Sequence, residues 1–172
     1  MLHLSEWENF YVIVGSAAAG LTGLQFVVIA LSGRSRSIGD VAQVEAFGTP
    51  TIVHFGAVLT IAAIMSIPGH SAGSLSLCLG AEGAAGIAYA IATTIRAARQ
   101  KGYEPVLEDW LWHSGFPIAA YAALLLTGIV AYRHTSGSLY VLAATALSLL
   151  FIGIHNAWDA AVYISVHKRD GE

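Results

Sequence analysis

The chain has 172 residues, of which 8 are Lys or Arg and 11 are Asp or Glu, so charged residues make up 11% where a soluble domain carries roughly 25%. Hydrophobic residues make up 56% and the mean hydropathy is +0.65, which excludes a disordered chain and indicates a membrane protein. The few scattered basic residues exclude a nucleic-acid-binding surface, and the single cysteine, Cys78, excludes an intrachain disulfide.

Long stretches without charged residues predict the membrane spans, because a spanning helix needs about 20 apolar residues. Four stretches contain no Asp, Glu, Lys or Arg: 9–33, 46–81, 110–132 and 134–158. The second is interrupted by Pro68-Gly69, so it contains one span and enters another. The sequence therefore predicts an all-α fold, a single transmembrane domain over residues 1–172. Its five helices are expected at about 6–32, 41–67, 72–98, 109–133 and 138–166.

Basic residues that flank these helices predict the orientation in the membrane. On the side of the N-terminus the only flanking basic residue is Arg133. The other side has seven: Arg34, Arg36, Arg96, Arg99, Lys101, Lys168 and Arg169. Because cytoplasmic loops are enriched in Lys and Arg, we expect the N-terminus outside and the C-terminus in the cytoplasm. The lipid bilayer that surrounds the chain is expected to be the inner (plasma) membrane of a prokaryote.

Small residues recur at helical spacing in the first and third predicted helices. They are Ser16, Gly20 and Gly23 in the first helix and Gly80, Gly83 and Gly86 in the third. Such residues let helix backbones approach closely. One interpretation is tight packing within a subunit, and the other is a contact between subunits of a homo-oligomer. Five helices enclose little volume, so a pore would form more naturally between subunits.

Polar side chains inside the predicted spans are the candidate functional residues. They are Gln25, His54, Glu82, His155, Asn156 and Asp159. At about 1.5 Å per residue, Gln25, His54 and Asp159 lie at a similar depth from the predicted cytoplasmic end. His155 is one turn deeper and Glu82 about one turn deeper again. Because polar residues in spans face protein or water and often mark ion or proton pathways, we expect a polar column where the helix faces converge.

His155 and Asp159 are spaced i, i+4 and therefore share one helix face. The carboxylate would orient the imidazole, raise its basicity or share a cation with it; alternatively, the pair only holds helices together. Glu82 has no Lys or Arg at its depth, so its expected partners are His54, His155 or a bound cation, the alternative being a neutral carboxyl bonded to a carbonyl oxygen. An interior of carboxylates and imidazoles suits protons or metal cations and disfavours anions.

Two prolines and a further histidine lie in the cytoplasmic thirds of predicted helices. Pro50 and Pro117 each leave the carbonyl four residues earlier without its helical partner and are expected to kink their helices. Kinked helices beside polar side chains can open a water-filled vestibule. His113, next to Trp112, is interpreted as a residue of the membrane interface.

The beginning of the chain carries a resemblance to a known group. Trp7 and Phe10, followed by Ala18-Ala19-Gly20-Leu21-Thr22-Gly23-Leu24-Gln25-Phe26-Val27, resemble the opening of small multi-span bacterial membrane proteins of unassigned function. Some of those proteins are labelled modulators of FtsH protease. Gln25 departs from their pattern, in which this position is apolar. The resemblance covers about 20 residues and implies a partner membrane protein that the chain would regulate.

Three functions remain open from the sequence. The first is a small oligomeric channel or carrier for a cation or protons, in which the polar column conducts. The second is a metal- or haem-binding membrane enzyme or electron-transfer subunit with His155, Asp159, Glu82 and His54 as ligands. Haem needs two histidines at matching depth, so a divalent metal with mixed His and carboxylate ligands fits better. The third is a non-transporting accessory protein. No nucleophile motif or phosphate loop favours an enzyme, and the cofactor stays open between none, a divalent metal and, less readily, haem.

Overall fold

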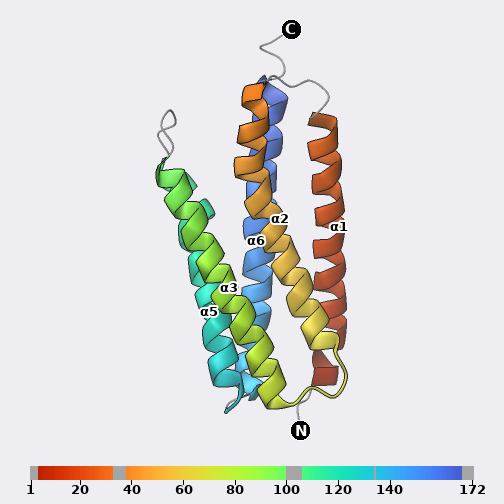
Figure 1. Cartoon of the computed structure of the whole chain (residues 1–172). Coiled ribbons are helices and arrows are strands. Elements are labelled where there is room, and N and C mark those ends of the chain that lie inside the picture. The colour runs from red at the N-terminus through yellow and green to blue at the C-terminus, as the bar shows by residue number, and fades with distance from the viewer. Residues whose placement is uncertain (1–3, 33–37, 100–105, 134, 168–172) are drawn as a thin grey trace.

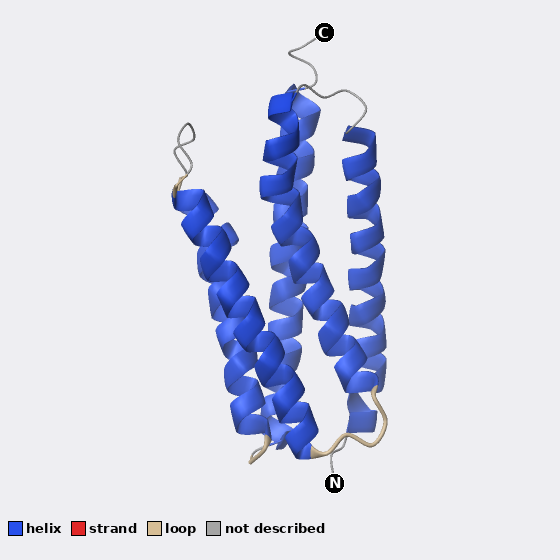
Figure 2. Cartoon of the chain, viewed as in Figure 1, coloured by secondary structure: helices blue, strands red, loops and turns tan. Residues whose placement is uncertain are grey.

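The computed structural model describes residues 4–32, 38–99, 106–133 and 135–167, which form helices joined by short turns, and no strand occurs among them (Figures 1 and 2). Side chains are described for 4–30, 49–99, 106–133 and 137–162. The elements are the 3₁₀-helix η1 (Leu4–Trp7), α1 (Glu8–Ser32), α2 (Ile38–Ser66), α3 (Ala72–Ala98), α4 (Leu107–Trp110), the π-helix η3 (Leu111–Gly115), α5 (Phe116–Ala131) and α6 (Thr135–His167).

Five helical stretches are long and apolar enough to cross a membrane, as the sequence predicts. They are Leu4–Ala30, Thr49–Ser66, Ala72–Ala98, Leu107–Ala131 and Gly137–Val162. Large apolar side chains cover the outside of the bundle; Ile13 is 68% exposed, Leu77 73% and Phe151 62%. Soluble monomers rarely expose contiguous apolar surface of this kind, whereas lipid would cover it. These features support a membrane protein.

The helices alternate in direction, so that α1 begins at the opposite end of the bundle from the end of α6 (Figure 1). The main helix pairs are α1 with α2, α2 with α6, α6 with α5, and α5 with α3. Figure 1 shows α3 and α5 leaning away from α2 and α6 toward the end at which α3 stops. Arg96 and Arg99 lie at this end of α3, whereas Arg133 follows α5 at the other end. The other basic flanking residues, Arg34, Arg36, Lys101, Lys168 and Arg169, lie outside the described residues.

Glycines bring α3 and α5 into backbone contact. A Cβ added to Gly83 would lie 2.7 Å from the Cα of Leu125, and one added to Gly128 would lie 2.7 Å from the Cα of Gly80. One added to Gly86 would lie 2.5 Å from the Cγ of Tyr121. Such distances are far inside the contact distance of about 3.5–4.0 Å between carbon atoms. Gly80, Gly83 and Gly86 therefore pack within the subunit, which is the first of the two interpretations of the small residues.

The small residues of α1 are used differently. Gly15 packs against α2, since an added Cβ would lie 2.7 Å from the Cβ of Ala62. Ser16, Gly20 and Gly23 are exposed on the outer face, and a Cβ added to Gly20 or Gly23 meets nothing within 4 Å. This outer face of α1 makes no packing contact within the described part of the chain at these two glycines.

Local signals explain where the helices begin and bend. Gly69, with φ +73°, makes the left-handed turn after α2, and the Ser71 hydroxyl accepts a hydrogen bond from the Ser74 N–H at the start of α3. Pro50 lies inside α2, which changes direction along its length (Figure 1). At Pro117 the structure refines the predicted kink. The turn before it is π-helical, and the Phe116 N–H donates to the carbonyl of Leu111, five residues back.

Several hydroxyl groups inside the helices are satisfied locally, as a lipid environment favours, whereas the buried hydroxyls of Ser76 and Tyr11 have no partner among the described residues. Each of the satisfied hydroxyls donates to the carbonyl oxygen one turn earlier. These residues are Thr22, Thr60, Ser66, Thr94, Thr127, Thr145 and Ser148. The hydroxyls therefore do not form a continuous polar path by themselves, and the candidate site has to be built from the remaining polar groups.

Candidate functional site

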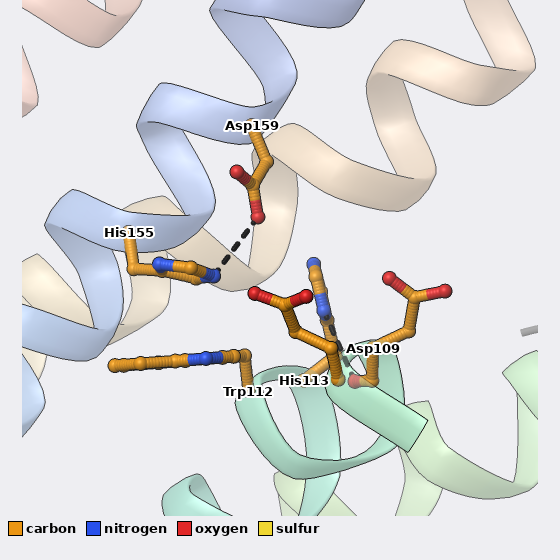
Figure 3. A pocket seen from close by; sticks show the side chains of 6 residues that line it. Asp109, Trp112, His113, His155 and Asp159 are labelled. Atoms are coloured by element: carbon orange, nitrogen blue, oxygen red, sulfur yellow. Dashed lines mark hydrogen bonds and ion pairs between the residues drawn. The ribbon is translucent and has the colours of Figure 1, made fainter. Parts of the chain in front are cut away.

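A polar cleft of about 210 Å³ lies between α6 and the segment formed by α4 and η3 (Figure 3). It is at the end of the bundle where α4 begins and α3 stops, which is the predicted cytoplasmic end. The lining residues are Glu108, Asp109, Trp112, His113, His155 and Asp159. Five of these six side chains are titratable, and none is Lys or Arg. We refer to this site as the acid–imidazole cleft.

His155 and Asp159 are joined directly, as their spacing predicts. The Nε2 of His155 lies 3.1 Å from the Oδ2 of Asp159, and their side chains are 25% and 48% exposed. Because an ionised carboxylate only accepts hydrogen bonds, Nε2 carries a hydrogen in this pair. The imidazole also stacks on the indole of Trp112, with ring centroids 3.8 Å apart and planes 18° apart. Two contacts from two helices therefore fix the orientation of the His155 ring.

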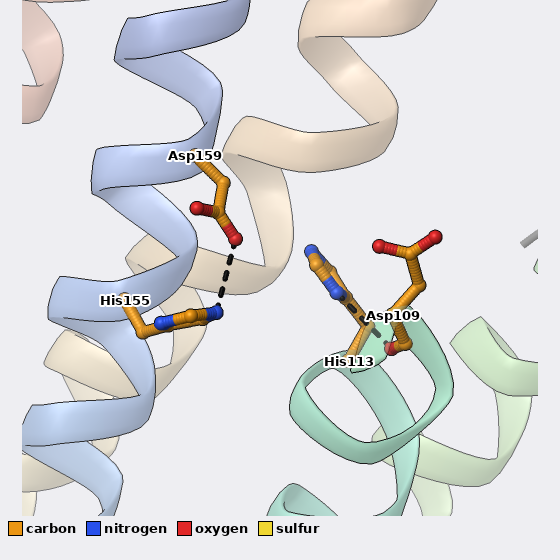
Figure 4. Close-up of polar contacts among 4 residues, drawn as sticks. All are labelled: Asp109, His113, His155 and Asp159. Atoms are coloured by element: carbon orange, nitrogen blue, oxygen red, sulfur yellow. Dashed lines mark hydrogen bonds and ion pairs between the residues drawn. The ribbon is translucent and has the colours of Figure 1, made fainter. Parts of the chain in front are cut away.

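His113 enters the cleft from the opposite wall. Its Nδ1 lies 3.2 Å from the backbone carbonyl oxygen of Asp109, one turn earlier in the same segment. Since a carbonyl only accepts, Nδ1 is the donor, and in the neutral ring Nε2 is the basic nitrogen. Figure 4 shows the outer edge of the ring directed into the space between Asp159 and the Asp109 side chain. The interpretation of His113 as a simple interface residue is therefore incomplete.

The chemistry of the cleft favours positive charge. Three carboxyl groups and two imidazoles share one small volume, and no basic side chain lines it. Such a concentration of negative charge attracts protons or cations and repels anions. Among the described residues, no three His, Cys, Asp or Glu side chains are arranged to hold a metal ion. The predicted metal ligands His155, Asp159, Glu82 and His54 are accordingly not gathered around one point, and only the first two are in contact.

Behind the cleft, His54 links α2 to α5. Its side chain is 2% exposed, and its Nδ1 lies 3.0 Å from the hydroxyl of Tyr121. The Tyr121 ring in turn lies against the backbone of Gly86, so three helices meet at this hydrogen bond. His113, which lines the cleft, precedes Tyr121 by eight residues in the segment formed by η3 and α5. The hydrogen bond is therefore a polar connection between the cleft side of the bundle and α3.

Glu82 does not have the partners that the sequence suggested. Both of its carboxyl oxygens are buried, and neither has a hydrogen-bond partner in the described part of the protein. The predicted pairing with His54 or His155 is absent, and so is the alternative bond to a carbonyl oxygen. Depth along a helix does not determine which face a side chain occupies, and that is why the pairing was wrong. Glu82 lies one turn before Gly86, on which the Tyr121 ring packs.

The remaining predicted residues, Gln25 on α1 and Asn156 on α6, are buried at about the level of Thr51 on α2, and we refer to these three residues as the polar layer. The contacts of Gly15 with Ala62 and of Gly153 with Phe55 fix the registers of α1 and α6 against α2. Counting along the helices from these contacts puts three buried residues at one level: Gln25 (6% exposed), Thr51 (0%) and Asn156 (1%). Neither side-chain polar atom of Asn156 has a hydrogen-bond partner among the described residues. This layer is separate from the His155–Asp159 pair on the same helix.

The contributions of α4, η3 and α5 to the site were not predicted from the sequence. Trp112, His113 and the carboxyl groups of Glu108 and Asp109 line the cleft, and Tyr121 binds His54. One signal was present in the sequence. Asp109 and His113 repeat the i, i+4 acid–imidazole spacing of His155 and Asp159, and both pairs lie near the same predicted end.

Comparison with known proteins assigns the chain to no family. No family model, no curated protein and no solved structure matches the chain. The resemblance of the region 7–27 to small bacterial membrane proteins, some labelled modulators of FtsH protease, therefore stays a prediction.

Proposed function

We propose that the protein is a small membrane channel or carrier for protons or a cation, which enter through the acid–imidazole cleft. The observation that carries this proposal is the lining of the cleft, in which three carboxyl groups and two imidazoles face one volume without a basic side chain. Intramembrane groups of this kind are costly to maintain and typically mark proton relays or ion pathways.

The interior of the bundle supports a path beyond the cleft. His54, Asn156 and Gln25 are buried at nearly the same level as His155, and Glu82 is buried deeper with no hydrogen-bond partner in the described structure. A buried polar group without a partner costs about 1–3 kcal/mol, so its retention calls for a use. Water or a passing cation would satisfy these groups during transport.

The assembly and its setting are part of the same proposal. We place the cleft on the cytoplasmic side of a prokaryotic inner membrane, because Arg96 and Arg99 lie at that end of the bundle. A homo-oligomer would use the exposed small residues Ser16, Gly20 and Gly23 of α1, where helix backbones can approach closely. A pore between subunits would then complete the path.

Ion flux into liposomes tests this function. The purified protein is reconstituted, and proton and cation flux is compared for the wild type and for Asp159→Asn, His155→Ala and Glu82→Gln. Each substitution is expected to reduce flux about tenfold or more, since each removes a group that binds the transported charge. The matched control is Glu8→Gln, which alters an exposed carboxylate at the opposite end of the bundle. Wild-type flux in all three variants, each folded and assembled, would reject the proposal.

Metal binding is the second candidate, favoured by the combination of imidazole and carboxylate ligands in the cleft. His155 and Asp159, the two of these side chains that are in contact, would be the first ligands to test. Metal analysis and an absorption spectrum of the purified protein distinguish the two functions. A stoichiometric divalent metal that is lost in His155→Ala, with no flux in liposomes, would favour this candidate over transport. A haem absorption band would instead indicate an electron-transfer subunit.

A further inference from the structure

Tyr121 lies between His54 on the cleft side of the bundle and the face of α3 that carries Glu82. Its hydroxyl lies 3.0 Å from the Nδ1 of His54 on α2, its own backbone belongs to α5, and its ring lies on Gly86 of α3. The side chain is 1% exposed. Contact with a glycine and a hydrogen bond together hold the ring in place. The tyrosine is therefore a fixed hydroxyl at the meeting point of three helices.

Glu82 lies on α3 four residues before Gly86, and thus on the helix face that the Tyr121 ring covers. Both carboxyl oxygens of Glu82 are buried without a hydrogen-bond partner in the described structure. On the other side of Tyr121, His54 is its hydrogen-bond partner. His113, which lines the cleft, precedes Tyr121 by eight residues in the segment formed by η3 and α5. These positions give the order His54, Tyr121 and Glu82, with His113 on the side of the cleft. No basic residue is part of this series.

We propose that Tyr121 relays protons between His54 and Glu82, which makes Glu82 a buried proton-binding site that is filled from the acid–imidazole cleft. This inference rests on the proposed function, because it takes the cleft as the point of entry. A hydroxyl suits the task since it donates and accepts hydrogen bonds at the same atom. No hydrogen bond joins Tyr121 to Glu82 in the described structure, so the proposed relay requires a water molecule between them.

The transfer conserves protons and charge at each group. Tyr121 passes its hydroxyl proton through the bridging water to the Glu82 carboxylate and receives the Nδ1 proton of His54. The hydroxyl is thereby restored and Glu82 becomes neutral. His54 recovers one proton at Nε2 from the cleft, so the net result is one proton moved from the cleft to Glu82.

Infrared spectroscopy of the whole protein in lipid nanodiscs tests the relay without requiring transport. A protonated Glu82 gives a C=O stretching band that Glu82→Gln removes, and transfer into D2O shifts this band as COOH becomes COOD. Tyr121→Phe keeps the ring on Gly86 and removes only the hydroxyl. We expect it to slow the exchange of the Glu82 band about tenfold or more, because it removes a positioned proton-transfer group. His54→Gln is a second variant with the same expected effect.

The matched control is Tyr11→Phe. Tyr11 is also 1% exposed, and its hydroxyl has no hydrogen-bond partner among the described residues, so this change should leave the exchange rate unaltered. Exchange at the wild-type rate in both Tyr121→Phe and His54→Gln would overturn the relay. So would a wild-type protein that never shows the Glu82 band at any pH at which it stays folded. Slowed exchange in a protein without flux in liposomes would uphold the relay and reject transport.

Discussion

Substitution of Gly86 by alanine is the sharpest test of how the fold holds the site. The added Cβ would lie 2.5 Å from the Cγ of Tyr121 and closer still to Cδ1 and Cε1. Carbon atoms need about 3.5 Å, so the ring has to move by about 1 Å. The Tyr121–His54 hydrogen bond of 3.0 Å would then exceed the range of a hydrogen bond.

The expected loss of stability combines two destabilising contributions with one stabilising contribution. Overpacking of a close contact costs about 1–3 kcal/mol, and an interhelical hydrogen bond in a membrane is worth about 0.6 kcal/mol. Alanine has a higher helix propensity than glycine, which stabilises the folded protein by up to about 1 kcal/mol. The net loss should therefore be about 1–3 kcal/mol. The proton exchange of Glu82 should also slow, because the relay residue is displaced.

Unfolding by SDS titration from a mild detergent, followed by tryptophan fluorescence, measures this loss. Gly80→Ala is the matched control, since it lies on the same helix and its added Cβ meets nothing within 4 Å. It should be neutral or slightly stabilising. If Gly86→Ala and Gly80→Ala have the same stability, the ring of Tyr121 does not lie on Gly86. The contact that is proposed to fix Tyr121 in position for the relay would then be absent.

Three further predictions concern assembly and burial. Tags at the two ends should report opposite sides of the membrane, with the N-terminus outside, and a shared side would contradict the alternation of the five helices (Figure 1). Gly20→Leu should weaken a homo-oligomer in membrane cross-linking, because the outer face of α1 is open at this glycine; a wild-type protein that stays monomeric would rule this interface out. Asn156→Leu should raise stability by about 1–3 kcal/mol by removing buried unpartnered groups, and should lower flux. A loss of stability would show that the amide has a partner.

The spans could be predicted from the sequence because the lipid bilayer requires each membrane-crossing helix to be long and apolar. About 20 apolar residues are needed for each crossing, and the third helix begins at Ala72 and ends at Ala98 as expected. The glycines of α3 could be recognised as packing residues by their spacing alone. Their partner helix could not, because contact with Leu125 or Tyr121 depends on how α3 and α5 are rotated against each other.

The site was predicted only where its residues are neighbours on one helix. His155 and Asp159 are one turn apart, so their contact follows from helix geometry. The stacking of Trp112 on His155 joins residues 43 positions apart, and the bond of His54 to Tyr121 joins residues 67 apart. Contacts of this kind depend on tertiary packing, and the spacing of residues along a single sequence does not reveal which distant residues meet. The wrong partners for Glu82 have the same origin.

The π-helical turn between Leu111 and Gly115 joins the two parts of the fourth span and contains one residue more than an α-helical turn. Packing of α5 on α3 sets the direction of Tyr121, whereas the wide turn sets the direction of Asp109 and its neighbours. Each residue of an α-helix rotates the chain by about 100°. Deleting one residue from this turn would let it become α-helical while the cleft carboxylates and α5 kept nearly their present directions, because the π-turn holds one residue more than an α-helical turn. Inserting a further residue would instead rotate the cleft carboxylates by about 100° against the interior.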